Sequence, residues 1–198
     1  MQRYRLEVAL RYWKPIQTGI EQDDDTAEVS RLGNCQPAEL RTAGIRLRRP
    51  LSPHLAARLG GMTIDLAEIE DSLAGESTPT AWIVEGAGGV LVPVNDSEFM
   101  TDLMRRLQLP VVVAARSTLG TINHTLLTLE ALRRRELQVA GVVMVGDRHA
   151  DNRDAIERYG SVTVLGEMPC FHPLTSAAVS SWAGAEFDTE SKLLDWLR

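Results

Sequence analysis

The chain has 198 residues, a hydrophobic content of 44% and a charged content of 24%, which favour one globular domain spanning residues 1–198. The formal net charge of -6 gives no reason to expect nucleic-acid binding, and no apolar run is long enough to span a membrane. Cys35 and Cys170 have neither metal-ligand spacing nor a disulfide framework, which fits a reducing compartment. We therefore predict a cytoplasmic protein that has neither a nucleic acid nor a membrane as partner.

Apolar runs alternate with amphipathic segments along the whole chain. After Met1 to Leu6, which resemble the tail of a helix, the predicted strands are 8–16, 42–47, 81–84, 111–115, 139–145 and 162–165. The predicted helices are 24–32, 53–59, 65–73, 97–107, 121–134, 152–159 and 191–198. Strands and helices that alternate at these lengths predict an α/β fold, a doubly wound, mostly parallel sheet with helices on both faces.

Three positions carry specific expectations about where elements begin and end. Pro15 should end the ladder of the first strand, because proline has no N–H to donate. Asp65 is a predicted N-cap of the helix that follows it. Ser97 is predicted near the cap of the next helix, with Phe99 and Leu103 facing the interior.

A carboxylate and four small residues follow the apolar run 81–84, in the segment Glu85-Gly86-Ala87-Gly88-Gly89. Small residues let the backbone approach a ligand closely and direct its N–H groups at anionic oxygens. Open α/β sheets hold ligands and their metal ions at the carboxyl ends of parallel strands. The segment therefore predicts phosphate chemistry with Mg²⁺.

Short motifs spread over residues 12–169 resemble, in their order, the dethiobiotin synthetase family. Each motif alone is weak, and the ordered series is specific. The motifs are Trp13-Lys14-Pro15-Ile16-Gln17-Thr18-Gly19, Asp24-Asp25-Thr26-Ala27, Ser52-Pro53-His54, Glu85-Gly86-Ala87-Gly88-Gly89, Leu119-Gly120-Thr121-Ile122-Asn123-His124 and Leu165-Gly166-Glu167-Met168-Pro169.

The resemblance implies a P-loop NTPase-like α/β fold and a cytoplasmic homodimer. It implies a ligase of biotin biosynthesis, whose substrates are 7,8-diaminononanoate, CO2 and ATP, with Mg²⁺ as the metal. One amine would take up CO2 to give a carbamate, which would attack the γ-phosphate of ATP. The second amine would then close the ureido ring and release phosphate.

The resemblance also implies roles at the ends of the first strands. Lys14 would neutralise carbamate and γ-phosphate oxygens, with a solvated lysine at a strand end as the alternative that its motif makes the weaker one. Thr18 would bind substrate, or be only a turn residue. Asp25 and Glu85 would bind Mg²⁺ and nucleotide, while a helix N-cap is the alternative for Asp25. In the run Asp23 to Asp25, one acid can cap while another faces the metal.

Three backbone segments complete the implied site. Gly86, Ala87 and Gly88 would present N–H groups to nucleotide oxygens, or form a tight turn only. Gly120, Thr121, Ile122 and Asn123 begin a helix that would receive the substrate carboxylate from across the dimer interface, or be capped by Thr121 or Asn123. Met168, Pro169 and Cys170 would lie beside the adenine, or form only a loop. Val145-Gly146 or Gly146-Asp147 stands where the family often carries Asn, so base preference is left open.

The glycine-rich Lys-Thr phosphate-binding loop that opens the family's fold has no counterpart in the sequence, and the first strand, loop and helix of the fold are missing with it. The missing segment is on the order of 20 residues. We expect an in-frame continuation upstream of Met1; a non-catalytic paralogue that binds a diamine or a partner is the alternative. The chain as written is expected to bind ATP weakly and to lack a central strand of its sheet.

Overall fold

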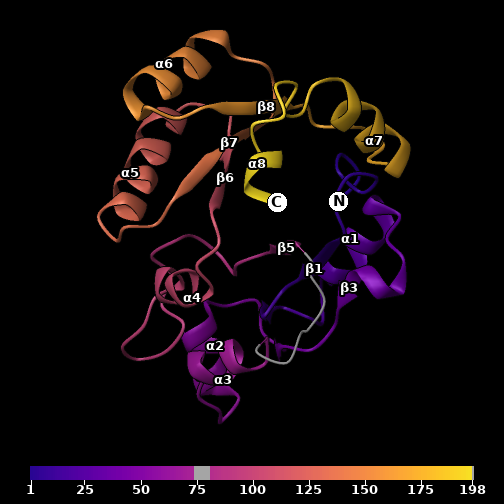
Figure 1. Ribbon diagram of the computed structural model, residues 1–198. Helices are drawn as coiled ribbons and strands as arrows, with labels where there is room; N and C mark the ends of the chain where they lie inside the picture. Colours follow the sequence, from indigo (N-terminus) through magenta and orange to yellow (C-terminus); the bar gives the residue numbers. More distant parts are fainter. Residues whose placement is uncertain (74–80, 198) are drawn as a thin grey trace. The chain divides into compact units, whose positions relative to one another are not determined.

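The computed structural model describes residues 1–73 and 81–197 (Figure 1). The chain divides into two compact units: Met1 with Arg5–Gln108, and Gln2–Tyr4 with Leu109–Arg198. Each unit is described by itself, and the single domain over residues 1–198 stays a prediction. Among the described residues, no helix is sufficiently long and apolar to cross a membrane.

The first unit is built on parallel strands. β1 (Leu10–Trp13) lies between β3 (Leu40–Arg41) and β5 (Ala81–Val84). β2 (Ile16–Thr18) and β4 (Ile45–Leu47) form a separate parallel pair. The predicted strand 8–16 is therefore two strands, because Pro15 lacks an N–H and interrupts the ladder between them.

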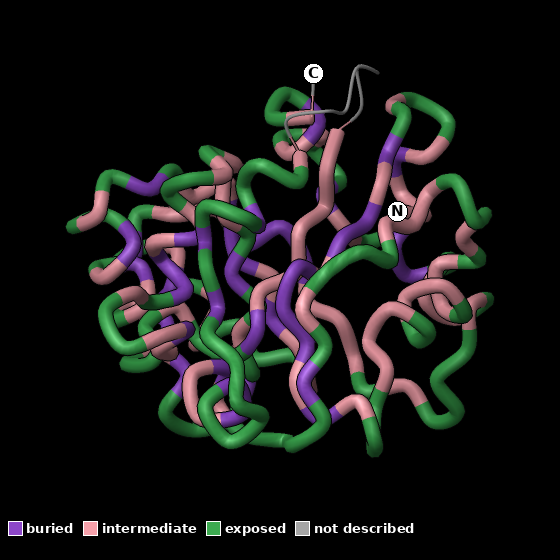
Figure 2. The backbone as a smooth tube through the Cα atoms, turned by 90° about the horizontal axis from the view of Figure 1, so that it is seen from below, coloured by how far each residue is buried: buried purple, intermediate pink, exposed green. Residues whose placement is uncertain are grey.

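The helices of the first unit pack around a core of large apolar side chains. They are α1 (Asp25–Gly33), the 3₁₀ turn η1 (Pro37–Glu39), α2 (Pro53–Leu59), α3 (Leu66–Asp71) and α4 (Met100–Leu107). Trp13, Ile64, Leu66 and Leu103 are almost fully buried in this core. The bounds predicted for α2 are confirmed, and buried stretches of the chain alternate with exposed connecting loops (Figure 2).

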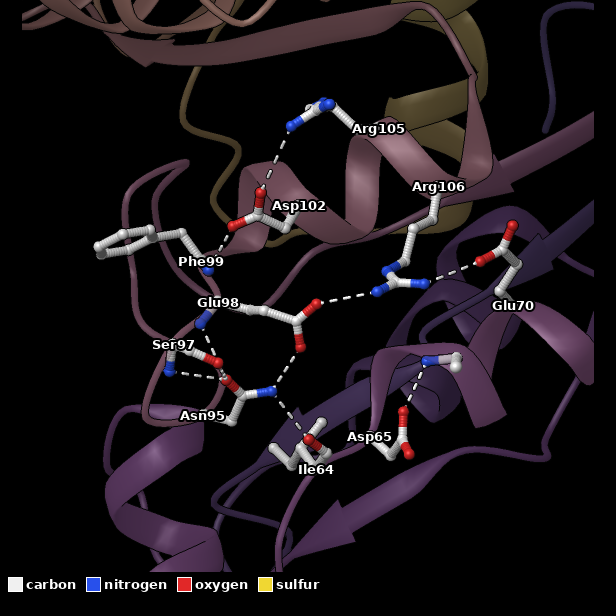
Figure 3. Close-up of polar contacts among 11 residues, drawn as sticks. Ile64, Asp65, Glu70, Asn95, Ser97, Glu98, Phe99, Asp102, Arg105 and Arg106 are labelled. Atoms are coloured by element: carbon white, nitrogen blue, oxygen red, sulfur yellow. Dashed lines mark hydrogen bonds and ion pairs between the residues drawn. The ribbon is translucent and has the colours of Figure 1, made fainter.

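Side-chain hydrogen bonds to backbone N–H groups mark the starts of α3 and α4: Asp65 caps α3, and Asp102 accepts the N–H of Phe99, the N-cap of α4 (Figure 3). Asp65 Oδ1 accepts the N–H of Ala67 at 2.8 Å, so the predicted cap is confirmed. Ser97 lies two residues before the N-cap of α4, as predicted, but does not cap the helix, since Asn95 Oδ1 accepts its N–H and holds it in a turn before the helix. Phe99 is the N-cap and is 39% exposed, so the expectation that it faces the interior is wrong, while Leu103 is buried as predicted.

A polar network ties the segment before α4 to α3 (Figure 3). Arg106 donates to Glu98 Oε1 at 3.0 Å and to Glu70 Oε2 at 3.2 Å. Asn95 Nδ2 donates to Glu98 Oε2 at 2.6 Å and to the Ile64 carbonyl at 3.0 Å. The residues just before α4 are thus held in place by hydrogen bonds to α3, to α4 and to the segment before α3.

The second unit has a parallel sheet in the order β6-β7-β8, formed by β6 (Val111–Arg116), β7 (Val139–Val145) and β8 (Val164–Met168). α5 (Thr121–Arg133) and α6 (Ala150–Gly160) lie side by side against these strands (Figure 1). The bounds predicted for β7 are confirmed, and those of α5 differ from the prediction by one residue.

The strands β5 and β6 are less buried than their apolar sequences predict. Each is an edge strand of its own sheet in the described residues. All of β5 is only partly buried, and Val112 in β6 is 40% exposed. The missing central strand of the sheet stays a prediction.

The two ends of the chain differ from the prediction. Residues 2–7 form turns rather than the tail of a helix, and Tyr4 is buried with its hydroxyl donating to Asp188. α7 (Ser176–Ala185) was not predicted, because its small residues give little periodicity, although Thr175 Oγ1 caps it by accepting the N–H of Ala178. The helix predicted over residues 191–198 is the short α8 (Leu194–Leu197).

Candidate functional site

The register of β1 and β5 places Lys14 next to Glu85. Trp13 pairs with Val84 in this parallel ladder, and Lys14 and Glu85 come one residue later on their strands. Lys14 Nζ lies 2.7 Å from Glu85 Oε1. It also lies 2.6 Å from Oδ2 of Asp25, the first residue of α1. Lys14 therefore contacts both an acid at the start of α1 and an acid at the carboxyl end of a parallel strand, where open α/β sheets bind ligands.

Lys14 is enclosed, whereas its two acidic partners are open to solvent. The side chain of Lys14 is 6% exposed, against 41% for Asp25 and 43% for Glu85. A third contact joins Lys14 Nζ to the Gly86 carbonyl at 3.3 Å. An enclosed ammonium group needs such partners, because burial of an unpaired charge is costly. The exposed carboxylates retain lone pairs that a ligand can reach.

Asp24, and not Asp25, caps α1. Asp24 Oδ1 accepts the N–H of Ala27 at 3.1 Å, and Asp24 Oδ2 pairs with Arg46 at 2.6 Å. Burial raises the pKa of Asp24, but the Ala27 N–H and the Arg46 guanidinium together outweigh it and leave this pKa below its ordinary value. The cap interpretation of Asp25 is therefore wrong, and its carboxylate is left to face Lys14.

The backbone after Glu85 is open to a ligand. In the described part of the chain, the N–H groups of Gly86, Ala87 and Gly88 have no hydrogen-bond acceptor. Gly88 has a φ of 80°, a left-handed conformation that favours glycine. Unpaired N–H groups next to a lysine and two acids form a polar cradle that can accept anionic oxygens.

Thr18 lies in the same unit, at the end of β2. It is partly buried, and the chain turns directly after it at Gly19, whose φ is 74°. No hydrogen bond between described residues joins the Thr18 side chain to Lys14. Its predicted contact with substrate stays a prediction.

In the second unit, α5 begins without a side-chain cap. Its N-cap is Gly120, with a φ of 92°. The alternative prediction, that Thr121 or Asn123 caps the helix, is therefore wrong. The Thr121 hydroxyl is buried and has no hydrogen-bond partner among the described residues. A cavity of about 290 Å³ lies at this helix start, lined in part by Thr121 and His124. Free N–H groups at a helix start attract anions, so the position suits a carboxylate.

The ends of β7 and β8 meet in the second unit. The N–H of Gly146 donates to the carbonyl of Met168, the last residue of β8, at 2.9 Å. Pro169 and Cys170 follow as a loop, in which Cys170 is exposed. Gly146 has a φ of 128°, and a Cβ there would lie 2.4 Å from Ser117 Oγ. Position 146 therefore requires glycine, and which of Val145 and Gly146 stands where the family often carries Asn stays open.

Comparison with known proteins gives the family. A model described as an AAA domain matches residues 1–178. The ATP-dependent dethiobiotin synthetase of Paramagnetospirillum magneticum is 48% identical over 169 residues, which are 85% of this chain and 80% of that protein. The chain belongs to the dethiobiotin synthetase family.

Two further dethiobiotin synthetases support the same family assignment. That of Sphingopyxis alaskensis is 43% identical over 89% of this chain and 83% of its own length. That of a Bradyrhizobium species is 43% identical over 89% of this chain and 82% of its own length. The family confirms the predicted P-loop NTPase-like α/β fold and the prediction of an ATP-using enzyme of biotin biosynthesis.

Asp25 and Glu85 fit a magnesium site of the kind that dethiobiotin synthetases would need for MgATP. In the described residues no group of three or more His, Cys, Asp or Glu side chains is placed to hold a metal ion. Mg²⁺ is commonly bound by one or two carboxylates, with water and substrate phosphates as the other ligands. Two exposed carboxylates in contact with one lysine meet this requirement.

Tyr12 is a residue of the site that the sequence did not predict. Tyr12 is 2% exposed and donates from its hydroxyl to Glu85 Oε2 at 2.7 Å. Burial, together with the hydrogen bond and negative charge of Glu85, raises the pKa of Tyr12 well above its ordinary value. The available signal was the two-residue spacing of Tyr12 and Lys14, which places both side chains on one face of a strand.

Proposed function

We propose that this chain catalyses formation of dethiobiotin from 7,8-diaminononanoate, CO2 and ATP. One amine of the substrate takes up CO2 to form a carbamate, and a carbamate oxygen attacks the γ-phosphorus of ATP and displaces ADP. The second amine then attacks the carbonyl carbon of the resulting carbamic-phosphoric anhydride, closes the ureido ring and expels phosphate. The single observation that carries the proposal is the contact of Lys14 with Asp25 and Glu85, in a chain that is 48% identical to a synthetase of this name.

Lys14 is assigned the central electrostatic role. Negative charge is shared between the carbamate oxygen and the γ-phosphate as phosphorus is transferred. A fixed ammonium group next to these oxygens stabilises this charge without reorganisation. The enclosure of Lys14, whose side chain is 6% exposed, strengthens the interaction because little water screens it.

Asp25 and Glu85 are assigned to Mg²⁺, which when bound neutralises charge on the phosphates of ATP. Each acid pairs with Lys14 through one carboxylate oxygen and has a side chain that is more than two-fifths exposed, at 41% and 43%. The unpaired N–H groups of Gly86, Ala87 and Gly88 are assigned to nucleotide oxygens nearby.

The remaining assignments lie at the ends of other elements. Thr18 would hydrogen-bond the diamine. The helix start formed by Gly120, Thr121, Ile122 and Asn123 would receive the substrate carboxylate of the partner protomer in a homodimer, which the unpartnered Thr121 hydroxyl supports. Met168, Pro169 and Cys170 would lie against the adenine. The relatives above are all synthetases, so nothing favours a non-catalytic role.

Incubation with ¹⁴C-bicarbonate, 7,8-diaminononanoate and MgATP tests the proposal. We expect label to enter dethiobiotin in a 1:1 ratio with ADP formed, and no label to enter when the diamine is omitted. Complementation of a biotin auxotroph should be done in parallel with the 198-residue chain and with a version extended upstream. Failure of both versions to form dethiobiotin contradicts the proposal.

A further inference from the structure

We propose that Tyr12 is a positioning residue, whose hydroxyl holds the Glu85 carboxylate so that its other oxygen faces Lys14. The two oxygens of Glu85 have separate donors: Oε2 accepts from Tyr12 at 2.7 Å, and Oε1 accepts from Lys14 at 2.7 Å. Two donors on different oxygens define the plane of a carboxylate, which one donor alone leaves free to rotate.

Tyr12 is itself held rigidly. It belongs to β1, the central strand of its sheet, and pairs in register with Leu40 on one side and Ile83 on the other. Its side chain is 2% exposed, so its ring cannot move without repacking of its surroundings. Tyr12 is thus a fixed donor, in contrast to Glu85, whose side chain is 43% exposed.

The strand geometry explains why a residue at position 12 can do this. Tyr12 and Lys14 are two residues apart, and side chains with this spacing extend from the same face of a strand. Glu85 lies one residue beyond the Trp13–Val84 pair on the neighbouring strand. Tyr12 in β1 and Lys14 directly after this strand can therefore both reach the Glu85 side chain, each donating to a different oxygen.

The consequence for catalysis rests on the proposed function, whereas the positioning itself does not. A carboxylate that is held by a buried donor keeps Lys14 and any cation at fixed places relative to each other. Loss of partners of this kind weakens metal affinity or activity by roughly 10- to 100-fold in metal sites. We therefore expect Tyr12 to act through Glu85 and not by contact with substrate.

Substitution Tyr12→Phe removes only the hydroxyl. The chain has two lysines, Lys14 and Lys192. Trace labelling of amines followed by peptide mass spectrometry therefore measures the reactivity of the Lys14 amine, with Lys192 as the internal reference. With Glu85 free to turn away, we expect labelling of Lys14 relative to Lys192 to rise roughly tenfold. Tyr4→Phe is the matched control, since it removes another buried hydroxyl that donates to a carboxylate, Asp188 in the second unit.

A second measurement separates positioning from a general loss of structure. In the Glu85→Ala background, Tyr12→Phe should change the Lys14 labelling ratio no further, because the carboxylate that Tyr12 holds is gone. In turnover assays Tyr12→Phe should lower kcat roughly tenfold and leave KM for the diamine nearly unchanged.

The outcomes are distinct. An unchanged labelling ratio in Tyr12→Phe, or an equal rise in Tyr4→Phe, overturns the positioning role whether or not the chain turns over. An equal rise caused by Tyr12→Phe in the Glu85→Ala background also overturns it. Absence of dethiobiotin formation by the unsubstituted chain, together with the expected labelling change, leaves the positioning role standing and contradicts the proposed function alone.

Discussion

Asp24 and Asp25 are consecutive, yet their carboxylates have different partners. Asp24 accepts the N–H of Ala27 and pairs with Arg46, whereas Asp25 Oδ2 lies 2.6 Å from Lys14 Nζ. The first stabilises the start of α1, and the second belongs to the candidate site. Because the backbone of a helix start points successive side chains in different directions, two identical residues have separate roles.

This division predicts opposite effects of two similar substitutions. Asp24→Ala should lower the free energy of unfolding by about 1 kcal/mol through loss of the cap and leave the chemistry intact. Asp25→Asn should leave α1 capped and lower kcat/KM for MgATP. Urea denaturation and steady-state kinetics on both variants check this. A larger loss of stability in Asp25→Asn than in Asp24→Ala would reverse the assignment.

The same contacts predict how the contribution of Asp24 depends on pH. The pKa of Asp24 is lowered in the folded state, so its stabilising effect is present above the ordinary value of 3.8 and is lost as pH falls through the folded pKa. The stability difference between the unsubstituted chain and Asp24→Asn should therefore shrink below about pH 4. Thermal denaturation at pH 7 and at pH 3 measures it, and a difference that grows on acidification would contradict the assignment.

Replacement of Lys14 by Met tests the electrostatic role with little change in side-chain volume. We expect kcat to fall by about 10²- to 10³-fold, as for loss of other transition-state charge contacts. Lys192→Met is the control, because Lys192 pairs with the exposed Glu190 on the surface of the second unit. ADP release in the presence of the diamine and bicarbonate measures the effect, and similar rates for both variants would exclude a catalytic role of Lys14.

Thr121 permits a test of the helix start of α5. Its buried hydroxyl has no partner among the described residues, so Thr121→Val should leave thermal stability unchanged or raise it. If the hydroxyl binds the substrate carboxylate, KM for the diamine should rise by roughly 10-fold while kcat changes little. Thr128→Val is the control in the same helix, since the Thr128 hydroxyl donates to the His124 carbonyl. An unchanged KM in Thr121→Val would show that the hydroxyl does not contact the diamine.

The network before α4 predicts a purely structural effect. Asn95 accepts the N–H groups of Ser97 and Glu98 and donates to the Ile64 carbonyl, so Asn95→Ala leaves several partly buried groups unpaired. We expect a loss of about 1–3 kcal/mol in the free energy of unfolding. Ser97→Ala removes a single exposed hydroxyl and should cost less. Urea denaturation of both variants measures the difference. Equal losses of stability would contradict the stabilising role of the Asn95 hydrogen bonds.

Local signals in the sequence were sufficient to predict where a helix begins and ends when one strong feature dominates. Pro53 at a helix start and Gly60 after its end fixed the bounds of α2, and the carboxylate of Asp65 fixed the cap of α3. They failed where side chains compete for the backbone, as at Asn95, whose turn delays the start of α4 to Met100. They also failed for residues 2–7, where burial of Tyr4 and its bond to Asp188 override a helix-like sequence.

The sequence by itself determined that an amine and acids stand at the ends of strands, because residue type and element order are both local information. Only the tertiary structure decided that Lys14 contacts Asp25 and Glu85, that Asp24 is the cap, and that Tyr12 holds Glu85. The physical reason is strand register: a parallel ladder sets which residues of β1 and β5 are neighbours, and a shift of one residue would place these side chains on opposite faces.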